Sequence, residues 1–362
     1  MPQQERELRS GYTTGACATA ATRGALLALL GQRVFAEATI RLPQGTLVTF
    51  PLHTCSFTSS EGRCSVIKDA GDDPDVTDKA EICALVSWSD EPGVSFRRGV
   101  GVGLVTKPGL PVPPGEPAIN PAPRQMIRDT VAEVLADAGA GARGVMVEIA
   151  VPRGVEMAQK TFNPRLGIVD GISILGTSGI VVPYSNAAWV ASVIQAIDVA
   201  AAQGCKHLVL TVGGRSERSA QAIYALPEVA FIRIGPFFGP ALKHCRTAGI
   251  ERVSIVAMIG KLAKFAGGNE SVHSTASRQD FDFLARLAAQ AGADAEVLQR
   301  IAVANTAQEV AQLLANQAVF FTLLCERAWE FGRSLLGAAC LDIVLVGING
   351  EVMGRHSMAS AC

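Results

Sequence analysis

Hydrophobic and polar positions follow one pattern up to about residue 184 and another beyond it. The first part opens with small residues at 11–18, which predict the start of a helix. A second helix is predicted at residues 123–138, where Ile127, Val131 and Val134 share a face. The remaining runs resemble short strands between turn-forming residues, at positions 34–40, 46–52, 82–88, 93–105, 145–151 and 166–182. This pattern predicts an α+β N-terminal domain over residues 1–184.

Beyond residue 185, stretches with helical spacing alternate with short, uniformly apolar runs. Such runs are typical of parallel strands that are buried on both faces. Strands are predicted at residues 208–212, 229–234 and 252–259, with helices at residues 187–203, 216–225 and 241–247. Helical spacing fills residues 280–336, and residues 341–348 are a candidate strand of the same sheet. We therefore predict a Rossmann-like α/β C-terminal domain over residues 185–362, with a parallel sheet and extra helices.

The composition agrees with two folded domains. Of the 362 residues, 49% are hydrophobic and 18% are charged, which excludes a disordered chain. The 32 basic and 33 acidic residues nearly cancel, so neither nucleic acid nor an anionic membrane is an expected partner. The uncharged stretch between Asp170 and Asp198 is long enough to span a bilayer, but glycine, proline and asparagine interrupt it. Because the polar N-terminus has no signal peptide, we expect a cytoplasmic protein, and a homo-oligomer stays open.

The cysteines and histidines do not form the pattern of a metal centre. The nine cysteines are scattered without a C-x-x-C pair, and the five histidines include no H-E-x-x-H motif. We therefore expect buried thiols in a reducing compartment and no metal bound by protein ligands.

A glycine turn after the first predicted parallel strand is a candidate ligand site. Residues 213–216 lie between a strand and a helix, where free backbone N–H groups bind anions or carboxylates. Gly235 follows the second strand, and Gly260 and Lys261 follow the third, at the sheet edge where ligands of α/β proteins bind. The full G-x-G-x-x-G pattern is absent and no acidic residue ends the second strand. A plain strand-to-helix turn therefore explains the glycines about as well, and a helix start with solvent-facing lysines would look the same as a ligand site at Gly260 and Lys261.

Two segments of the N-terminal part carry further candidates. Thr13 and Thr14 either cap the first helix or donate hydroxyl groups to a ligand, and close packing of small residues is the alternative. Residues 68–78 hold five aspartates, whose crowding can raise a carboxyl pKa and create a general base. The alternative is a solvated loop of Asx turns.

Two other segments suit ligand walls. Residues 108–123 contain seven prolines and form either a stiff wall or a surface connector. Lys160 and Arg165 flank an Asn-Pro turn, which makes either a carboxylate clamp or a solvated charged turn.

Five segments stand out together, in this order along the chain: residues 11–18, residues 68–77 with DAGDDPDVT, residues 105–126 with GEPAINP, residues 160–167, and residues 171–183, which read GISILGTSGIVVP. In these segments the chain resembles the cobalt-precorrin-5B C1-methyltransferase family of the corrin ring pathway. The resemblance implies transfer of a methyl group from S-adenosyl-L-methionine to carbon 1 of a tetrapyrrole.

That chemistry gives the candidate residues their expected roles. In-line methyl transfer from a sulfonium depends on aligning two reactants and excluding water, and it needs no enzyme nucleophile. Asp72 or Asp75 is the expected base for the proton that the ring loses. The expected cofactor-binding residues are Gly213, Gly214, Ser216, Gly235 and Gly260. The expected substrate-binding residues are Thr13, Thr14, Lys68, Asp69, Lys107, Glu116, Asn120, Lys160, Arg165, Thr177, Ser178 and Lys261.

We expect the N-terminal domain to bind the tetrapyrrole and the C-terminal domain to bind S-adenosyl-L-methionine, with both ligands meeting in a cleft between the domains. A nicotinamide-dependent reductase of the same pathway is the first alternative, and the missing G-x-G-x-x-G argues against it. The second alternative is a non-catalytic corrinoid-binding protein, which would lack a saturable site for the methyl donor.

Overall fold

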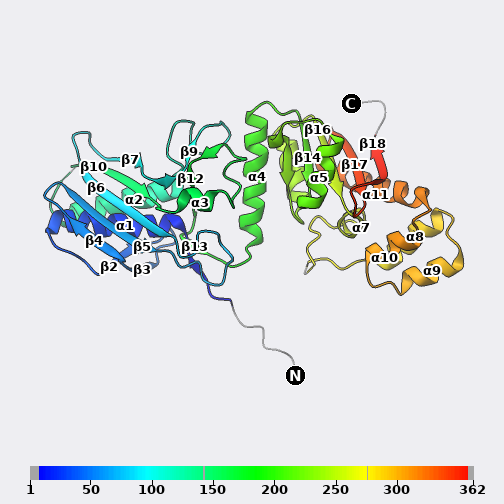
Figure 1. The fold of residues 1–362 in the computed structure, drawn as a ribbon, viewed down its shortest axis with the longest axis horizontal. Coiled ribbons are helices and arrows are strands. Elements are labelled where there is room, and N and C mark those ends of the chain that lie inside the picture. The colour runs from blue at the N-terminus through cyan, green and yellow to red at the C-terminus, as the bar shows by residue number, and fades with distance from the viewer. Residues whose placement is uncertain (1–7, 142, 275, 358–362) are drawn as a thin grey trace, which may run out of the picture. The chain divides into compact units, whose positions relative to one another are not determined.

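The computed structural model describes residues 8–141, 143–274 and 276–357 (Figure 1). The chain divides into two compact units, Met1–Ser185 and Asn186–Cys362, called here the N-terminal unit and the C-terminal unit. Each unit combines helices with both parallel and antiparallel strand pairs, so the fold class is mixed α/β.

The N-terminal unit is built on a five-stranded sheet in the order β4-β5-β6-β10-β7. Neighbouring strands are antiparallel except β10 and β7, which are parallel. Alternate residues of β6, among them Ile82, Ala84 and Val86, are buried, so one face of the sheet is apolar. The strands span Thr54–Phe57 (β4), Glu61–Ile67 (β5), Glu81–Ser89 (β6), Val94–Arg98 (β7) and Gly144–Ala150 (β10).

Helices α1 (Thr14–Gly31) and α2 (Pro121–Asp137) share one apolar core with this sheet and pack against each other. Small residues let α1 approach the sheet closely. A Cβ atom on Gly62 of β5 would lie 1.9 Å from the carbonyl oxygen of Ala25, so only glycine fits there. The helix start predicted within residues 11–18 is confirmed at Thr14, and the helix predicted at 123–138 is confirmed within two residues at each end.

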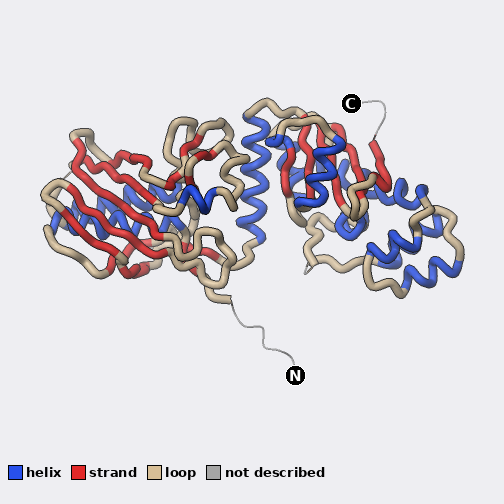
Figure 2. Tube along the Cα trace, viewed as in Figure 1, coloured by secondary structure: helices blue, strands red, loops and turns tan. Residues whose placement is uncertain are grey.

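Short strand pairs complete the unit, and loops make up much of the surrounding chain (Figure 2). The hairpin of β2 (Glu37–Arg41) and β3 (Leu47–Pro51) confirms two predicted strands. The long runs predicted at 93–105 and 166–182 are wrong in extent, because glycine turns divide them into short pieces. The pieces outside the main sheet are β1 (Gly11–Tyr12) with β13 (Ile180–Val181), β8 (Gly101–Val102) with β12 (Gly171–Ile172), and β9 (Leu104–Val105) with β11 (Ile168–Val169), next to α3 (Gly154–Ala158).

Two strands of the main sheet, β4 and β5, are absent from the predicted set. β4 is an edge strand with only Cys55 and Phe57 as apolar residues, and β5 carries Glu61 and Arg63 among its first residues. Such segments show little apolar alternation, so their strand structure depends on pairing: β5 pairs with β6, and β4 pairs with β5.

The sheet of the C-terminal unit has the order β15-β14-β16-β17-β18. Its first four strands are parallel, and β18 runs antiparallel to β17. The strand predicted at 341–348 is confirmed as β17, whereas β18 is absent from the predicted set. The strands span His207–Thr211 (β14), Phe231–Arg233 (β15), Arg252–Ala257 (β16), Cys340–Val346 (β17) and Val352–Ser357 (β18).

Helices cover both faces of this sheet (Figure 1), as the uniformly apolar strands predict. Leu208 and Leu210 of β14 share a core with α4, α6, α7 and α11, while Val209 packs with Ala220 of α5 on the other face. The region predicted as helical at 280–336 contains α8 to α11. The helices span Asn186–Ala202 (α4), Gly214–Ile223 (α5), Phe238–Thr247 (α6), Ile259–Ala266 (α7), Phe281–Gln290 (α8), Ala295–Ala302 (α9), Ala307–Leu313 (α10) and Ala318–Leu336 (α11), with a 3₁₀ turn at Glu228–Ala230 (η1).

Within the described residues, no helix has both the length and the apolar content that crossing a bilayer requires. Seven described cysteines carry free thiols. Cys17, Cys64, Cys245 and Cys325 are buried, and Cys55, Cys83 and Cys205 are partly exposed, so the expectation of buried thiols holds for the first four.

Candidate functional site

The resemblance motifs of the N-terminal unit meet at the N-terminal end of α1. Tyr12 N–H donates to the carbonyl oxygen of Asp69 at 2.8 Å, and Gly15 N–H donates to that of Leu175 at 3.0 Å. Gly15 also packs against Pro123 so closely that a Cβ atom would lie 2.6 Å from the proline ring. We call this assembly the motif cluster; it comprises residues 10–15, 68–79, 116–124, 160–167 and 171–181.

Both threonines of the opening motif use their hydroxyl groups inside the cluster. Thr13 is the N-cap of α1, and its Oγ1 accepts a hydrogen bond from Ala16 N–H at 3.2 Å. Thr14 Oγ1 accepts from Leu175 N–H at 2.9 Å and lies 3.3 Å from the carbonyl oxygen of Ser173. The capping alternative therefore holds for Thr13, and Thr14 ties the 171–181 loop to the helix.

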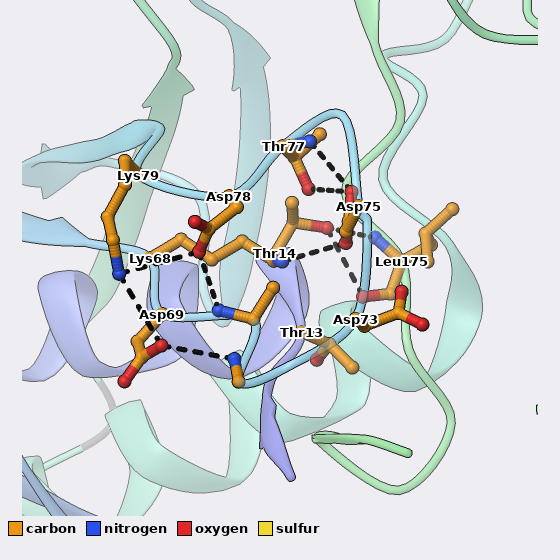
Figure 3. A network of polar contacts seen from close by, with 12 residues as sticks. Thr13, Thr14, Lys68, Asp69, Asp73, Asp75, Thr77, Asp78, Lys79 and Leu175 are labelled. Atoms are coloured by element: carbon orange, nitrogen blue, oxygen red, sulfur yellow. Dashed lines mark hydrogen bonds and ion pairs between the residues drawn. The ribbon is translucent and has the colours of Figure 1, made fainter. Parts of the chain in front are cut away.

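A buried ion pair lies under the acidic loop (Figure 3). The Lys68 side chain is 1% exposed, and its Nζ donates to Asp75 Oδ2 at 2.8 Å. Asp75 Oδ1 accepts from both the backbone N–H and the hydroxyl of Thr77, each at 2.7 Å. Burying an ammonium group is costly without such a partner, so the pair holds the loop against the body of the unit.

The other aspartates of the loop also accept hydrogen bonds. Asp69 binds the Arg9 guanidinium with both oxygens, at 2.6 and 2.8 Å, and accepts from Gly71 N–H. Asp72 Oδ2 accepts from Arg9 N–H at 2.8 Å, and Asp73 Oδ1 accepts from Tyr184 N–H at 2.8 Å. The loop thus follows the Asx-turn alternative, and Arg9 is a partner that the sequence analysis did not single out.

This hydrogen bonding corrects the expectation that crowding raises a carboxyl pKa. Hydrogen bonds from Arg9 and Gly71 lower the pKa of Asp69 from its usual value. Burial tends to raise the pKa of Asp75, but the Lys68 charge and the hydrogen bonds from Lys68 and Thr77 outweigh it and lower that pKa. Cations and N–H donors compensate the like charges, so both groups stay ionised.

The 160–167 and 116–124 segments are held by side chains that bridge loops. Asn163 is buried; its Nδ2 donates to the Gly171 carbonyl oxygen at 3.0 Å, and its Oδ1 accepts from Ser173 Oγ at 3.3 Å. Arg124 binds the Ile119 carbonyl oxygen at 2.7 Å and pairs with Glu116 at 2.6 Å. The Asn-Pro turn drew attention to Asn163, but the sequence did not indicate its role, because its hydrogen-bond partners lie in another segment.

The remaining predicted substrate residues differ in exposure. Lys160, Thr177 and Ser178 are exposed, while Lys107 and Arg165 are half-buried. Asn120 is the N-cap residue of α2 but its side chain makes no capping hydrogen bond. In contrast to Lys68, these side chains lie where a ligand in solvent can reach them.

The predicted cofactor residues gather at one edge of the C-terminal sheet. Thr211 pairs with Arg233 on one side and with Val256 on the other. Gly213 and Gly235 each lie two residues beyond this paired level, and Gly260 lies four residues beyond it, at the carboxyl ends of the parallel strands. This edge is where open α/β sheets bind ligands.

Three of the edge glycines are not required by packing. A Cβ atom on Gly213 or Gly260 would meet no atom within 4 Å, and on Gly214 it would meet only the Arg218 guanidinium at 3.7 Å. The backbone of Gly213 is extended, with φ of −176°. Since neither space nor conformation demands glycine at Gly213, its small size leaves room for another molecule.

Two other predicted edge residues serve the protein itself. Ser216 Oγ accepts from Val212 N–H and Gly213 N–H, both at 3.1 Å, and so closes the turn. Lys261 Nζ donates to the Val272 carbonyl oxygen at 3.1 Å, and burial together with the nearby Lys264 lowers the Lys261 pKa. Lys261 is therefore engaged with the loop near residue 272.

Two further features lie outside these clusters. A hollow of about 460 Å³ runs along α2 and β7, lined in part by Val94, Val131, Leu135, Arg128 and Arg143, and it includes none of the predicted site residues. In the described part of the chain, no group of three or more histidine, cysteine, aspartate or glutamate residues is arranged to hold a metal ion.

These observations define a protein with two mixed α/β units, one organised around a motif cluster and the other with an open, glycine-lined sheet edge. The chain belongs to the CbiD family: the CbiD profile matches residues 1–183, and the profile of the CbiD C-terminal domain matches residues 271–357.

Curated relatives are similar over nearly the whole chain. A protein of Geobacillus kaustophilus is 52% identical over 98% of this chain and 96% of its own length. Proteins of Priestia megaterium and Pseudomonas aeruginosa are 49% and 44% identical over 98% of this chain and 98% and 97% of theirs. All three are named cobalt-precorrin-5B C(1)-methyltransferase. A crystal structure of the cobalamin biosynthesis protein cbiD from Archaeoglobus fulgidus is 26% identical, with a TM-score of 0.40 over 79% of this chain and 85% of that one.

Proposed function

We propose that this protein is a C-methyltransferase that methylates carbon 1 of cobalt-precorrin-5B, giving cobalt-precorrin-6A, in cobalamin biosynthesis. The observation that carries the proposal is identity of 44–52% over 98% of the chain to relatives named for this reaction. Such coverage includes both units, so the similarity is not confined to one of them.

The methyl donor is S-adenosyl-L-methionine, and the C-terminal unit binds it as a Rossmann-like domain. Three features support this assignment: four parallel strands, helices on both faces, and a carboxyl edge at which Gly213 and Gly260 leave open space. Backbone N–H groups at the start of α5 suit the carboxylate of the methionine part. When bound, the donor supplies an electrophilic methyl group.

The tetrapyrrole binds to the N-terminal unit at the motif cluster. The ring precursor carries carboxylate side chains, and Lys107, Lys160 and Arg165 are cations that reach solvent near the cluster. Thr177 and Ser178 add exposed hydroxyl groups on the adjacent loop. The charges of Lys68 and Asp75 pair with each other, so these residues support the exposed groups by holding the acidic loop against the body of the unit.

Asp72 is the favoured base for the ring proton. Asp72 is half-buried, and within the described residues its carboxylate accepts one hydrogen bond, from Arg9 N–H. Lone pairs therefore remain for a substrate. Asp75 is less suited, since Lys68 and Thr77 occupy both of its oxygens. The protein's other task is to align the two reactants and exclude water.

Incubating the purified protein with cobalt-precorrin-5B and methyl-labelled S-adenosyl-L-methionine tests the reaction. Label at carbon 1 of the product is the expected result, and label at another carbon would revise the substrate assignment. Binding of NADPH in place of S-adenosyl-L-methionine would favour a reductase. Tetrapyrrole binding without saturable donor binding would indicate a carrier.

A further inference from the structure

Trp189 is the exposed tryptophan at the carboxyl edge of the C-terminal sheet. It lies in the first turn of α4, and 46% of its surface is exposed. The other two tryptophans have internal partners: Trp88 stacks under the Arg143 guanidinium at 3.8 Å, and Trp329 Nε1 donates to the Leu341 carbonyl oxygen at 3.0 Å. Within the described residues, no hydrogen bond to protein atoms involves the Trp189 indole. A large aromatic group is thus presented to solvent.

The indole lies directly on the backbone of Gly235. A Cβ atom there would lie 3.0 Å from Trp189 Nε1 and 3.2 Å from Cε2. Gly235 also has a φ of +56°, which disfavours other residues. Both conditions favour glycine, and the contact places the indole just beyond the end of β15.

The end of β15 corresponds to the place where dinucleotide-binding α/β proteins bind the nucleoside of their ligand. In such sheets the glycine turn follows the first strand, and an acidic residue near the end of the second strand binds the ribose hydroxyls. Here the glycine turn at Gly213 follows β14, and β15 is the second strand. β15 ends in Arg233, followed by Ile234 and Gly235, so the strand itself supplies no acidic residue at its end. The nearby carboxylate of Glu217, from α5, is buried and pairs with the Arg233 guanidinium. The indole of Trp189 lies at this strand end.

An aromatic ring recognises a base by stacking, without a carboxylate. Gly213 and Gly235 each follow two residues after the paired Thr211 and Arg233 of adjacent strands, so one ligand can contact both. Resting on the proposed function, we infer that Trp189 is the stacking platform for the adenine of S-adenosyl-L-methionine and positions the nucleoside at a strand end that carries no ribose-binding acid of its own. The methionine part then lies toward Gly213.

Trp189 emission should respond to the adenosine part of the donor and not to the methionine part. In a Trp88→Phe, Trp329→Phe variant, Trp189 is the remaining tryptophan, and its emission reports on stacking. S-adenosyl-L-methionine and adenosine are both expected to quench this emission with saturation, whereas free methionine leaves it unchanged. Quenching by cobalt-precorrin-5B but not by adenosine would overturn the inference, because the indole would then face the ring.

The affinities of Trp189 variants for S-adenosyl-L-methionine test whether the aromatic ring at this position contributes to binding by stacking. Loss of one base-stacking partner weakens binding roughly tenfold. Trp189→Leu should therefore raise the calorimetric Kd for S-adenosyl-L-methionine roughly tenfold, while Trp189→Phe, which keeps a ring, should recover most of the affinity. Trp88→Phe, in the N-terminal unit, is the matched control and should bind as the wild type does.

The results distinguish this inference from the proposed function. If the wild type methylates carbon 1 and Trp189→Leu binds the donor equally well, the inference fails and the function stands. If the wild type does not bind S-adenosyl-L-methionine, both fail. Thermal unfolding of each variant checks its fold, and if Trp189→Leu does not fold, Trp189→Phe and the quenching experiment decide.

Discussion

Replacing Asp75 by asparagine tests whether the buried ion pair holds the acidic loop. The Lys68 ammonium is 2.8 Å from Asp75 Oδ2, with Lys68 1% and Asp75 26% exposed. Asparagine keeps the shape and an acceptor for Thr77 N–H, but it leaves the buried ammonium without a counter-charge. Breaking a fully buried pair costs about 3–5 kcal/mol, and partial exposure of Asp75 reduces the expected loss to about 2–3 kcal/mol.

The unfolding free energy lost in Asp75→Asn should depend on pH and should be larger near neutral pH than in acid. The folded-state pKa of Asp75 is lowered, so its contribution to stability is present above the unfolded-state pKa of about 3.9. This contribution disappears as the pH falls through the folded-state value. The difference in unfolding free energy between wild type and Asp75→Asn is therefore largest near neutral pH and shrinks below about pH 4.

Urea unfolding measures this difference in the N-terminal unit alone. In a Trp189→Phe, Trp329→Phe background, Trp88 in β6 reports only on that unit. We expect Asp75→Asn to lower the urea midpoint at an unchanged slope. Asp129→Asn, which removes an exposed carboxylate bonded to Gln125, is the matched control and should change stability by less than about 0.5 kcal/mol.

A double variant completes the test. Lys68→Met with Asp75→Asn removes the buried charge together with its partner and should recover most of the loss, since apolar replacements of buried pairs are often neutral. A loss below about 0.5 kcal/mol for Asp75→Asn alone would refute the reasoning. An equal loss at acidic and neutral pH would refute it as well, because the Asp75 charge would then not be the cause.

Three further predictions concern single residues. Asp72→Asn should lower kcat for labelled methyl transfer about 10²–10⁴-fold, with ring affinity nearly unchanged; retained kcat would exclude Asp72 as the base. Gly213→Val should weaken calorimetric binding of S-adenosyl-L-methionine roughly tenfold while leaving the melting temperature unchanged, because its side chain would enter open space. Thr13→Ala should cost about 1 kcal/mol in urea unfolding, and an unchanged midpoint would contradict its capping role.

The sequence was informative wherever the cause of structure is local. Mostly apolar runs predicted the parallel strands of the C-terminal unit, since strands buried on both faces carry few polar residues; Ser254 and Asp342 are buried exceptions. Apolar spacing at Ile127, Val131 and Val134 predicted α2. Strands β4 and β5 were not predicted because their apolar alternation is weak and their structure depends on pairing, of β5 with β6 and of β4 with β5.

The partners of the charged and polar side chains were decided only by the tertiary structure. Five aspartates in one loop suggested a raised pKa, yet Arg9 pairs with Asp69 and Lys68 with Asp75, and Arg9 comes from another segment. Likewise, nothing near Gly235 in the sequence points to Trp189. A residue's type determines which interactions it can make, but the long-range packing of strands and loops determines which group it meets, and at this protein's candidate sites the second determines the chemistry.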